Sequence, residues 1–401
     1  MKILFIILIL RMVIMSFGSD NITCDYVWRY LDYTWDNETQ MKQANDTGNY
    51  DPTQCITDDG KKVSDGRVIV TSPKEFGPGC PVTLTVVSND KKGAGGPLLR
   101  PYPDWKWHSK TWNKTHPDCT GLVNVARIDL KCGHLFAMDT GKVGRDERLC
   151  SPKLVIIRLK DDKVVKIIHI PEKMATNNET GKGVLVKPLV FLPSEDCSQL
   201  LDNMIIFMAD YYGNGLVVYN SVKDSMCRIE SKYMEPVDDL FVLKNHDTFI
   251  YPAGIFSMTV ICNECKTSCY LYWAPISGKA IYRTDIDHLL NCPNKDQANN
   301  KTKYTIKLAS QTVDMESVDH TLYYSDTGAM SIVRRNVCKL SSQSKPVTVT
   351  EEMQPVLGVV TTMSSLENGK EMQFIEDNYK IFKYTSVDLS SINFRYCRFK
   401  I

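Results

Sequence analysis

The chain has 401 residues, 43% of them hydrophobic, so it is long enough to bury a large core. Its 48 lysines and arginines balance 47 aspartates and glutamates, for a formal net charge of +1. This balance gives no reason to expect nucleic acid or an anionic membrane as a partner.

The N-terminus has the features of a secretory signal peptide. Lys2 precedes an apolar run, and the small residue Gly18 sits where a signal peptidase would cut. An uncleaved membrane anchor is disfavoured, because Arg11 interrupts a run that is already too short to span a bilayer. We therefore expect a signal peptide at 1–18 and a secreted, extracellular, single-domain chain at 19–401.

A first strand is expected between Tyr26 and Tyr33, followed by a polar loop. Farther along lies Ile205–Asn220, in which two apolar runs flank Asp210 and a glycine-containing turn. This strand–turn–strand pattern occurs six times, and the units open at Arg67, Leu135, Ile205, Cys269, Thr321 and Glu371.

The units recur every 50 to 70 residues or so, which suits four-stranded propeller repeats extended by longer loops. Little helix is expected, apart from one short turn near Asp285–Leu290. The sequence therefore predicts an all-β, six-bladed β-propeller. In such a fold the N-terminal strand often completes the last blade and removes an open edge.

Motifs for catalysis or cofactor binding are missing from the sequence. The glycines at 93, 95 and 96 lack the Gly-Lys-Ser/Thr of a phosphate loop, and no histidine pair has the HExxH spacing. No serine lies in a G-x-S-x-G elbow. The sequence thus motivates no catalytic residue, no cofactor and no metal.

Carboxylates end several apolar strands at equivalent places in the repeat. The simplest explanation is local, because aspartate caps turns by bonding the backbone two residues on. The functional alternative is that these strand ends converge on one face, attract a small cation and offer a neighbouring tyrosine for stacking. The candidate ligand-binding residues are Asp139, Asp210, Asp326, Glu376, Asp377 and Tyr379.

Several motifs occur in one order along the chain: PLLRPYPDWKWH, Asp129-x-x-Cys132-x-x-Leu135, MDTG, CSPKL, MADYYGNGLVVYN, LYWAPIS and a terminal INFR. From about Trp28 to Arg395 the chain resembles the Yellow/major royal jelly protein family of insects. It departs from the family pattern in the last blade, at Met372–Asn378, which marks it as a divergent member. The resemblance implies a secreted six-bladed β-propeller.

The resemblance also implies three classes of function. Salivary family members of blood-feeding flies bind biogenic amines in the central channel, partly through two last-blade positions that match Asp377 and Tyr379 here. Other branches are linked to dopachrome conversion in melanin formation, and others serve as nutrients. The leading expectation is a non-enzymatic binding protein for a small cationic or catechol-type ligand. The alternatives are a dopachrome-converting enzyme and a nutrient or structural glycoprotein. The oligomeric state stays open.

The 14 cysteines all follow the signal peptide, and an even number in a secreted chain favours disulfides. A zinc site at Cys262, Cys265 and Cys269 is disfavoured, because the compartment is oxidising and further ligands would be needed. The predicted disulfides are Cys132–Cys197, at the starts of neighbouring repeats, and Cys119–Cys150. Six sequons are candidate glycosylation sites: Asn21, Asn37, Asn45, Asn113, Asn178 and Asn300.

Overall fold

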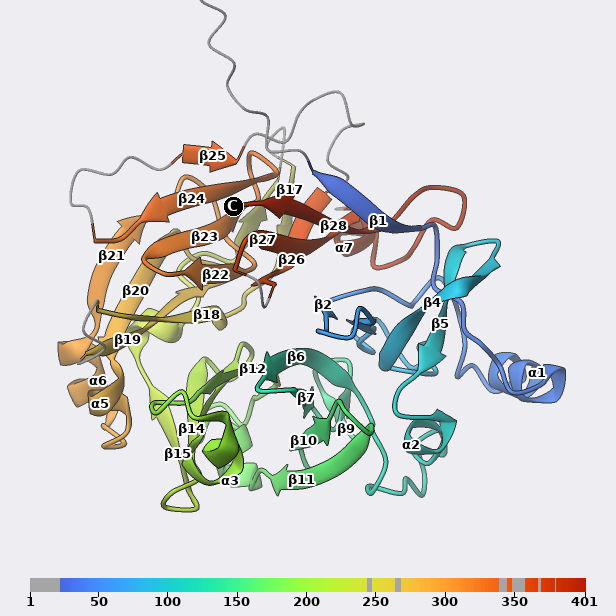
Figure 1. The fold of residues 1–401 in the computed structure, drawn as a ribbon, viewed down its shortest axis with the longest axis horizontal. Coiled ribbons are helices and arrows are strands. Elements are labelled where there is room, and N and C mark those ends of the chain that lie inside the picture. The colour runs from blue at the N-terminus through green and yellow to red at the C-terminus, as the bar shows by residue number, and fades with distance from the viewer. Residues whose placement is uncertain are drawn as a thin grey trace, which may run out of the picture.

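Six four-stranded antiparallel sheets stand as blades around a central axis in this computed structural model (Figure 1). Strands make up 44% of the structure, and the predicted six-bladed propeller is confirmed. The expected signal peptide at 1–18 lies outside the described residues. Those residues are 22–243, 247–263, 268–338, 345–347, 358–366, 369–378 and 380–401.

The blades follow one another along the chain, and the strand nearest the axis comes first in each. The first blade is β2 (Gly60–Lys62), β3 (Val68–Thr71), β4 (Leu84–Gly93) and β5 (Gly96–Pro101). The second is β6 (Val125–Lys131), β7 (His134–Asp139), β10 (Lys153–Arg158) and β11 (Lys163–His169). The third is β12 (Leu185–Phe191), β13 (Ile205–Asp210), β14 (Gly215–Asn220) and β15 (Ser225–Glu230).

The fourth blade is β18 (Ile255–Cys262), β19 (Cys269–Pro275), β20 (Ala280–Asp285) and β21 (Lys303–Lys307). The fifth is β22 (Met315–Val318), β23 (Thr321–Asp326), β24 (Ser331–Asn336) and β25 (Lys345–Val347). The sixth is β26 (Gly358–Ser365), β27 (Glu371–Asn378), β28 (Phe394–Lys400) and β1 (Thr23–Trp28). Two small hairpins are added, β8 (Lys142–Val143) with β9 (Glu147–Arg148), and β16 (Leu240–Val242) with β17 (Thr248–Ile250).

Helices are short and lie between strands. They are α1 (Glu38–Asp46), α2 (Trp105–Ser109), α3 (Glu172–Ala175), α4 (Leu200–Asn203), α5 (Ile286–Leu289), α6 (Lys295–Lys301) and α7 (Lys380–Tyr384). Single 3-10 turns occur at Cys197–Gln199 and Lys232–Met234. The expected turn at Asp285–Leu290 is α5. None of the helices among the described residues has the length and apolar character that crossing a bilayer requires.

The middle strands are apolar on both faces because the blades stack against each other. All six residues of β13 are buried, whereas most residues of the outer strand β15 are only half-buried. A hydrophobic cluster fills each gap between neighbouring blades. Burying apolar surface on both faces supplies the main stabilisation of such a fold, and it explains why the sequence shows continuous apolar runs rather than alternation.

Two of the six predicted units differ from their expected form. In the unit that opens at Leu135, β7 pairs with β10 rather than with the short β8 that follows the turn. Glu371–Asn378 is strand β27, but the segment after it forms helix α7 instead of a second strand. Helix α7 has buried Ile381 on one side, and the paired strand is β28, farther along the chain. The initial strand is also displaced: β1 spans Thr23–Trp28 and pairs with β28, so the N-terminus completes the last blade as expected.

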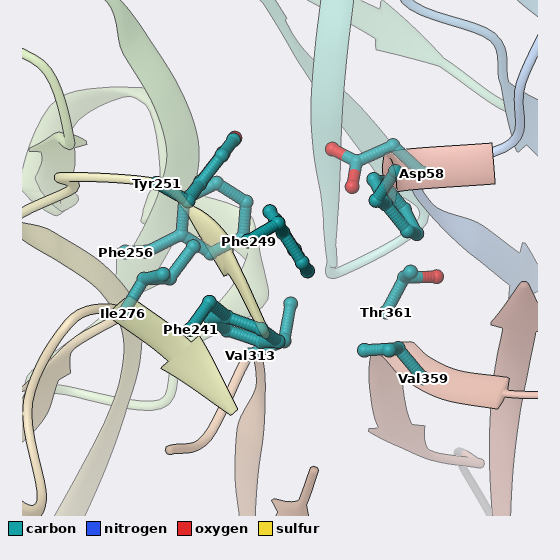
Figure 2. Close-up of a pocket in the computed structure, with 10 residues that line it drawn as sticks. Asp58, Phe241, Phe249, Tyr251, Phe256, Ile276, Val313, Val359 and Thr361 are labelled. Carbon is teal, nitrogen blue, oxygen red and sulfur yellow. The ribbon is translucent and has the colours of Figure 1, made fainter. Parts of the chain in front are cut away.

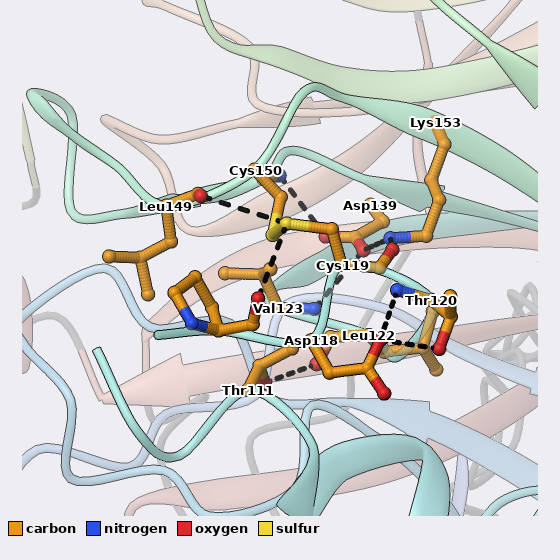
Figure 3. Close-up of a disulfide and its surroundings, with 12 residues drawn as sticks. Thr111, Asp118, Cys119, Thr120, Leu122, Val123, Asp139, Leu149, Cys150 and Lys153 are labelled. Carbon is orange, nitrogen blue, oxygen red and sulfur yellow. Dashed lines mark hydrogen bonds and ion pairs between the residues drawn. A yellow bond between two sulfur atoms is a disulfide. The ribbon is translucent and has the colours of Figure 1, made fainter. Parts of the chain in front are cut away.

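Five disulfides join cysteines of the described residues. Both pairs expected from the sequence are present, with Cα–Cα distances of 5.3 Å for Cys132–Cys197 and 5.6 Å for Cys119–Cys150. The Cys119–Cys150 bridge closes the loop around Asp139 (Figure 3). The remaining bridges are Cys24–Cys397, Cys227–Cys292 and Cys262–Cys269, while Cys265 lies outside the described residues.

Candidate functional site

Asp139, at the end of β7, stabilises its own corner of the second blade. Its carboxylate accepts the backbone N–H group of Val123 at 3.1 Å and pairs with Lys153 at 2.8 Å (Figure 3). It also accepts the backbone N–H group of Asn124 at 2.9 Å. Burial opposes its ionisation, but Lys153 and these hydrogen bonds outweigh burial and lower its pKa. The turn-capping explanation therefore describes this residue.

Asp210 and Asp326 occupy the equivalent corners of the third and fifth blades. Asp210 pairs with Arg228 at 2.8 Å and accepts the backbone N–H groups of Val184 and Gly213. Asp326 accepts the Ser310 hydroxyl and the N–H of Ala329. The strand-end acids thus make local contacts in separate blades.

The two acids of the last blade, Glu376 and Asp377, are both buried at the end of β27. Glu376 is 2% exposed and pairs with Arg395 at 3.1 Å. Asp377 is fully buried and accepts the Thr57 hydroxyl at 2.6 Å, while its other oxygen has no partner among the described residues. Burial raises the pKa of Asp377 well above its usual range, which favours the neutral carboxyl. Tyr379 lies outside the described residues.

A buried ionic cluster lies midway along the central channel, at a level called the waist below. Its members are Asp58, Arg127, Lys187 and Asp314. The Arg127 guanidinium, from β6, makes two 3.1 Å bonds to Asp58 and lies 3.3 Å from Asp314. Lys187, from β12, also pairs with Asp314, whose second oxygen accepts the N–H of Met363 at 2.7 Å. Side chains from two inner strands and from residues just before two others therefore meet at the axis, between the two channel mouths.

A pocket lies above this cluster, at the mouth where the inner strands begin. Figure 2 shows aromatic side chains on one side of it, and Asp58 and Thr361 on the other. Its cavity volume is about 50 Å³, room for a few water molecules. The pocket is lined by Asp58, Phe241, Phe249, Tyr251, Phe256, Ile276, Val313, Val359, Thr361 and Phe382.

Two polar residues, Asp58 and Thr361, are among those that line this apolar pocket. The Asp58 side chain is 18% exposed, and burial raises its pKa to about 6, against the lowering effect of Arg127. The Thr361 hydroxyl is buried and has no hydrogen-bond partner within the described part of the chain. A carboxylate and an open hydroxyl beside aromatic rings suit a ligand with an apolar ring and a polar, cationic end.

A second layer holds the aromatic wall in place. The Arg145 guanidinium stacks 4.3 Å from the centroid of the Tyr251 ring and bonds to Glu75 at 3.3 Å. On the floor, Arg127 stacks 4.1 Å from the centroid of Phe256. These cation–π contacts fix the rings from outside, so the ring faces and edges toward the cavity are positioned before any ligand arrives.

The predicted mouth and the observed pocket coincide only in part. Asp377 contacts Thr57, the neighbour of Asp58, but neither Asp377 nor Glu376 lines the pocket. Sequence reasoning missed Asp58, which precedes the inner strand of the first blade rather than ending a middle strand. It also missed Phe241 and Phe249, which come from the β16–β17 hairpin between the third and fourth blades.

Within the described part of the chain, no group of three or more His, Cys, Asp or Glu side chains is arranged to hold a metal ion. Cys262 and Cys269, considered above as zinc ligands, are joined as a disulfide.

Comparisons with known proteins place the chain among its relatives. Residues 123–401 match the family model described as major royal jelly protein. The chain is 32% identical over 272 residues to major royal jelly protein 3 of Apis mellifera, covering 66% of this chain and 46% of that relative. It is 25% identical over 407 residues to major royal jelly protein 9 of A. mellifera, covering 95% of this chain and 88% of that relative.

In its first matches the chain spans about half the length of the curated relatives. Among solved structures, virginiamycin B lyase from Staphylococcus aureus aligns with a TM-score of 0.42 and 10% identity, over 95% of this chain and 100% of that one. Similarity at that level carries no argument about function.

Proposed function

The chain belongs to the major royal jelly protein family, and we propose that it is a binding protein that holds a small aromatic amine in the mouth of its central channel. Family membership supports a secreted, non-enzymatic protein. The observation that carries the proposal is the placement of the Asp58 carboxylate opposite the rings of Phe241, Tyr251 and Phe256.

Each part of an aromatic amine has a partner in this pocket. An ammonium group would be attracted by the charge of Asp58 and donate it a charge-assisted hydrogen bond, a contact of about 1.5–3 kcal/mol. The ligand ring would pack among Phe241, Phe249 and Phe256, and a catechol hydroxyl would fill the open hydrogen-bonding capacity of Thr361. The small cavity means that Phe249 and Phe382, both half-buried at the rim, must turn outward to admit the ligand.

Asp58→Asn is expected to weaken dopamine or serotonin binding by about tenfold or more, because the amide keeps the shape but loses the charge that attracts the ammonium. Isothermal titration calorimetry of the wild type and the variant measures this. Thermal unfolding of both proteins checks that the variant remains as stable as the wild type. This is expected because Arg127 still has its ion pair with Asp314.

The Asp377→Asn variant tests whether Asp58 or Asp377 is the carboxylate that binds the ammonium group. If Asp58 is that carboxylate, Asp377→Asn changes amine affinity little, because Asp377 touches Thr57 rather than the pocket. A larger loss in Asp377→Asn than in Asp58→Asn would restore the placement expected from the sequence. Conversion of dopachrome by the wild type would contradict a purely binding role.

Amine affinity is expected to fall by about tenfold as the pH drops from 7.5 to 5. Asp58 has a pKa of about 6, so acid protonates it and removes the charge that holds the ammonium. The charged groups that influence it are Arg127, Asp59 and Glu75. Calorimetry at both pH values tests this, and Asp58→Asn should lack most of the dependence. If the wild type and the variant showed an equal pH dependence, the change in affinity would arise from a titrating group other than Asp58.

A further inference from the structure

A second cavity lies at the opposite mouth of the channel, where the inner strands end. Its volume is about 490 Å³, and all six inner strands contribute to its lining. Polar side chains dominate near the axis, in contrast to the aromatic upper pocket. They include Lys61, Lys62, Asp129, Thr259, Glu316, Ser317 and Ser364.

Lys61 is the unusual group of this lower cavity. The residue is only 6% exposed, yet its ammonium makes no hydrogen bond or ion pair with any residue that the structure describes. Burial opposes its charge, but the carboxylates of Asp59, Asp129 and Glu316 outweigh burial and raise its pKa. A buried ammonium with three unused donors faces a cavity that could supply acceptors.

Glu316 supplies the complementary group. One of its oxygens accepts the N–H of Ser317 at 2.9 Å and the Thr259 hydroxyl at 3.5 Å, while no partner of the other oxygen lies among the described residues. Asp129 differs, because its oxygens accept the N–H groups of Leu130 and Val190. The cavity therefore offers one open cationic donor and one open anionic acceptor.

The charges around Lys61 select the kind of ligand. A ligand carboxylate would gain one ammonium contact but would approach the three carboxylates of Asp59, Asp129 and Glu316. A ligand ammonium would meet Lys61 itself. A hydroxyl group avoids both conflicts, since its oxygen accepts from Lys61 while its hydrogen is donated to Glu316.

We propose that this lower cavity is a binding site for a neutral polyhydroxylated molecule, a monosaccharide or a polyol, with Lys61 as donor and Glu316 as acceptor. Its volume accommodates a molecule of that size. The Arg127–Asp314–Lys187 cluster separates this site from the amine pocket. The polyol proposal can therefore be tested independently of the amine proposal.

Titration calorimetry of the wild type with glucose, myo-inositol and glycine tests the proposal. Glucose or myo-inositol is expected to bind, and glycine is not. Lys61→Met and the nearly isosteric Glu316→Gln are each expected to weaken polyol binding by about tenfold or more. Lys223→Met, at an exposed lysine outside the cavity, should leave the affinity unchanged.

Circular dichroism and thermal unfolding confirm that each variant is folded. If Lys61→Met does not fold, Glu316→Gln still decides the outcome. The proposal is overturned if neither polyol binds the wild type, if glycine binds in preference, or if both folded variants keep wild-type affinity.

Discussion

Replacing Asp314 by alanine is expected to lower the free energy of unfolding by about 3–5 kcal/mol, the cost of breaking a buried ion pair by removing one partner. Asp314 is fully buried. It forms ion pairs with Arg127 and Lys187 and accepts a hydrogen bond from the N–H of Met363. Its loss leaves Lys187 buried without an ion-pair partner among the described residues. Because several blades meet at this carboxylate, no single blade can relax to compensate.

Chemical denaturation of the oxidised protein measures this loss. The matched control is Asp46→Ala, which removes a surface pair with Lys42 and should cost no more than about 1 kcal/mol. A loss below about 1 kcal/mol for Asp314→Ala would show that the ionic cluster does not stabilise the waist.

The pH dependence gives a second measurement on the same variant. Burial opposes ionisation of Asp314, but Lys187 and Arg127 outweigh burial and lower its pKa. A lowered folded-state pKa contributes stability above the unfolded value, and that stability is lost as the pH falls. The difference between wild type and Asp314→Ala should therefore narrow below about pH 4.

Removing the Cys24–Cys397 disulfide by a double serine substitution is expected to cost about 4–5 kcal/mol, near the upper end of the range for disulfides. The bridge joins residues 373 apart and ties β1 to β28, the pair that completes the last blade. Without it, the unfolded chain regains the freedom of a very long loop, and the N-terminal strand is held by its ladder and packing alone.

The Cys262–Cys269 bridge is the matched comparison, because its cysteines are only 7 residues apart within the β18–β19 hairpin. Its double serine variant is expected to lose about half as much stability. Denaturant unfolding of both variants tests the ranking. Equal losses would indicate that local geometry, rather than closure of the ring, determines what these bridges contribute.

Much of the fold was predictable because its determinants are local. The continuous apolar runs of Ile205–Asn220 predict a buried hairpin. Both strands of that hairpin are buried because they lie between neighbouring blades. Asp139 and Asp210 end their strands as caps, a role that turn chemistry alone suggests. The sequence at Lys380–Tyr384 predicts a strand, but the segment is a helix, because a short apolar run does not distinguish strand from helix.

The candidate site was harder to predict because its parts are brought together by ring closure. Asp58, Phe241 and Phe256 come from separate stretches, and no spacing in the sequence links them. Lys61 and Lys187 resemble surface lysines in sequence, yet both are buried at the axis. Only the arrangement of the inner strands shows that both ammonium groups are under the influence of buried carboxylates.

A crystal structure of the protein grown with dopamine tests the central claim most directly. We expect ligand density in the upper pocket, with the ammonium group at hydrogen-bond distance from Asp58 and the ring among Phe241, Tyr251 and Phe256. The rim side chains Phe249 and Phe382 should be displaced outward. An empty upper pocket at saturating dopamine, or dopamine bound elsewhere on the propeller, would contradict the proposed binding role.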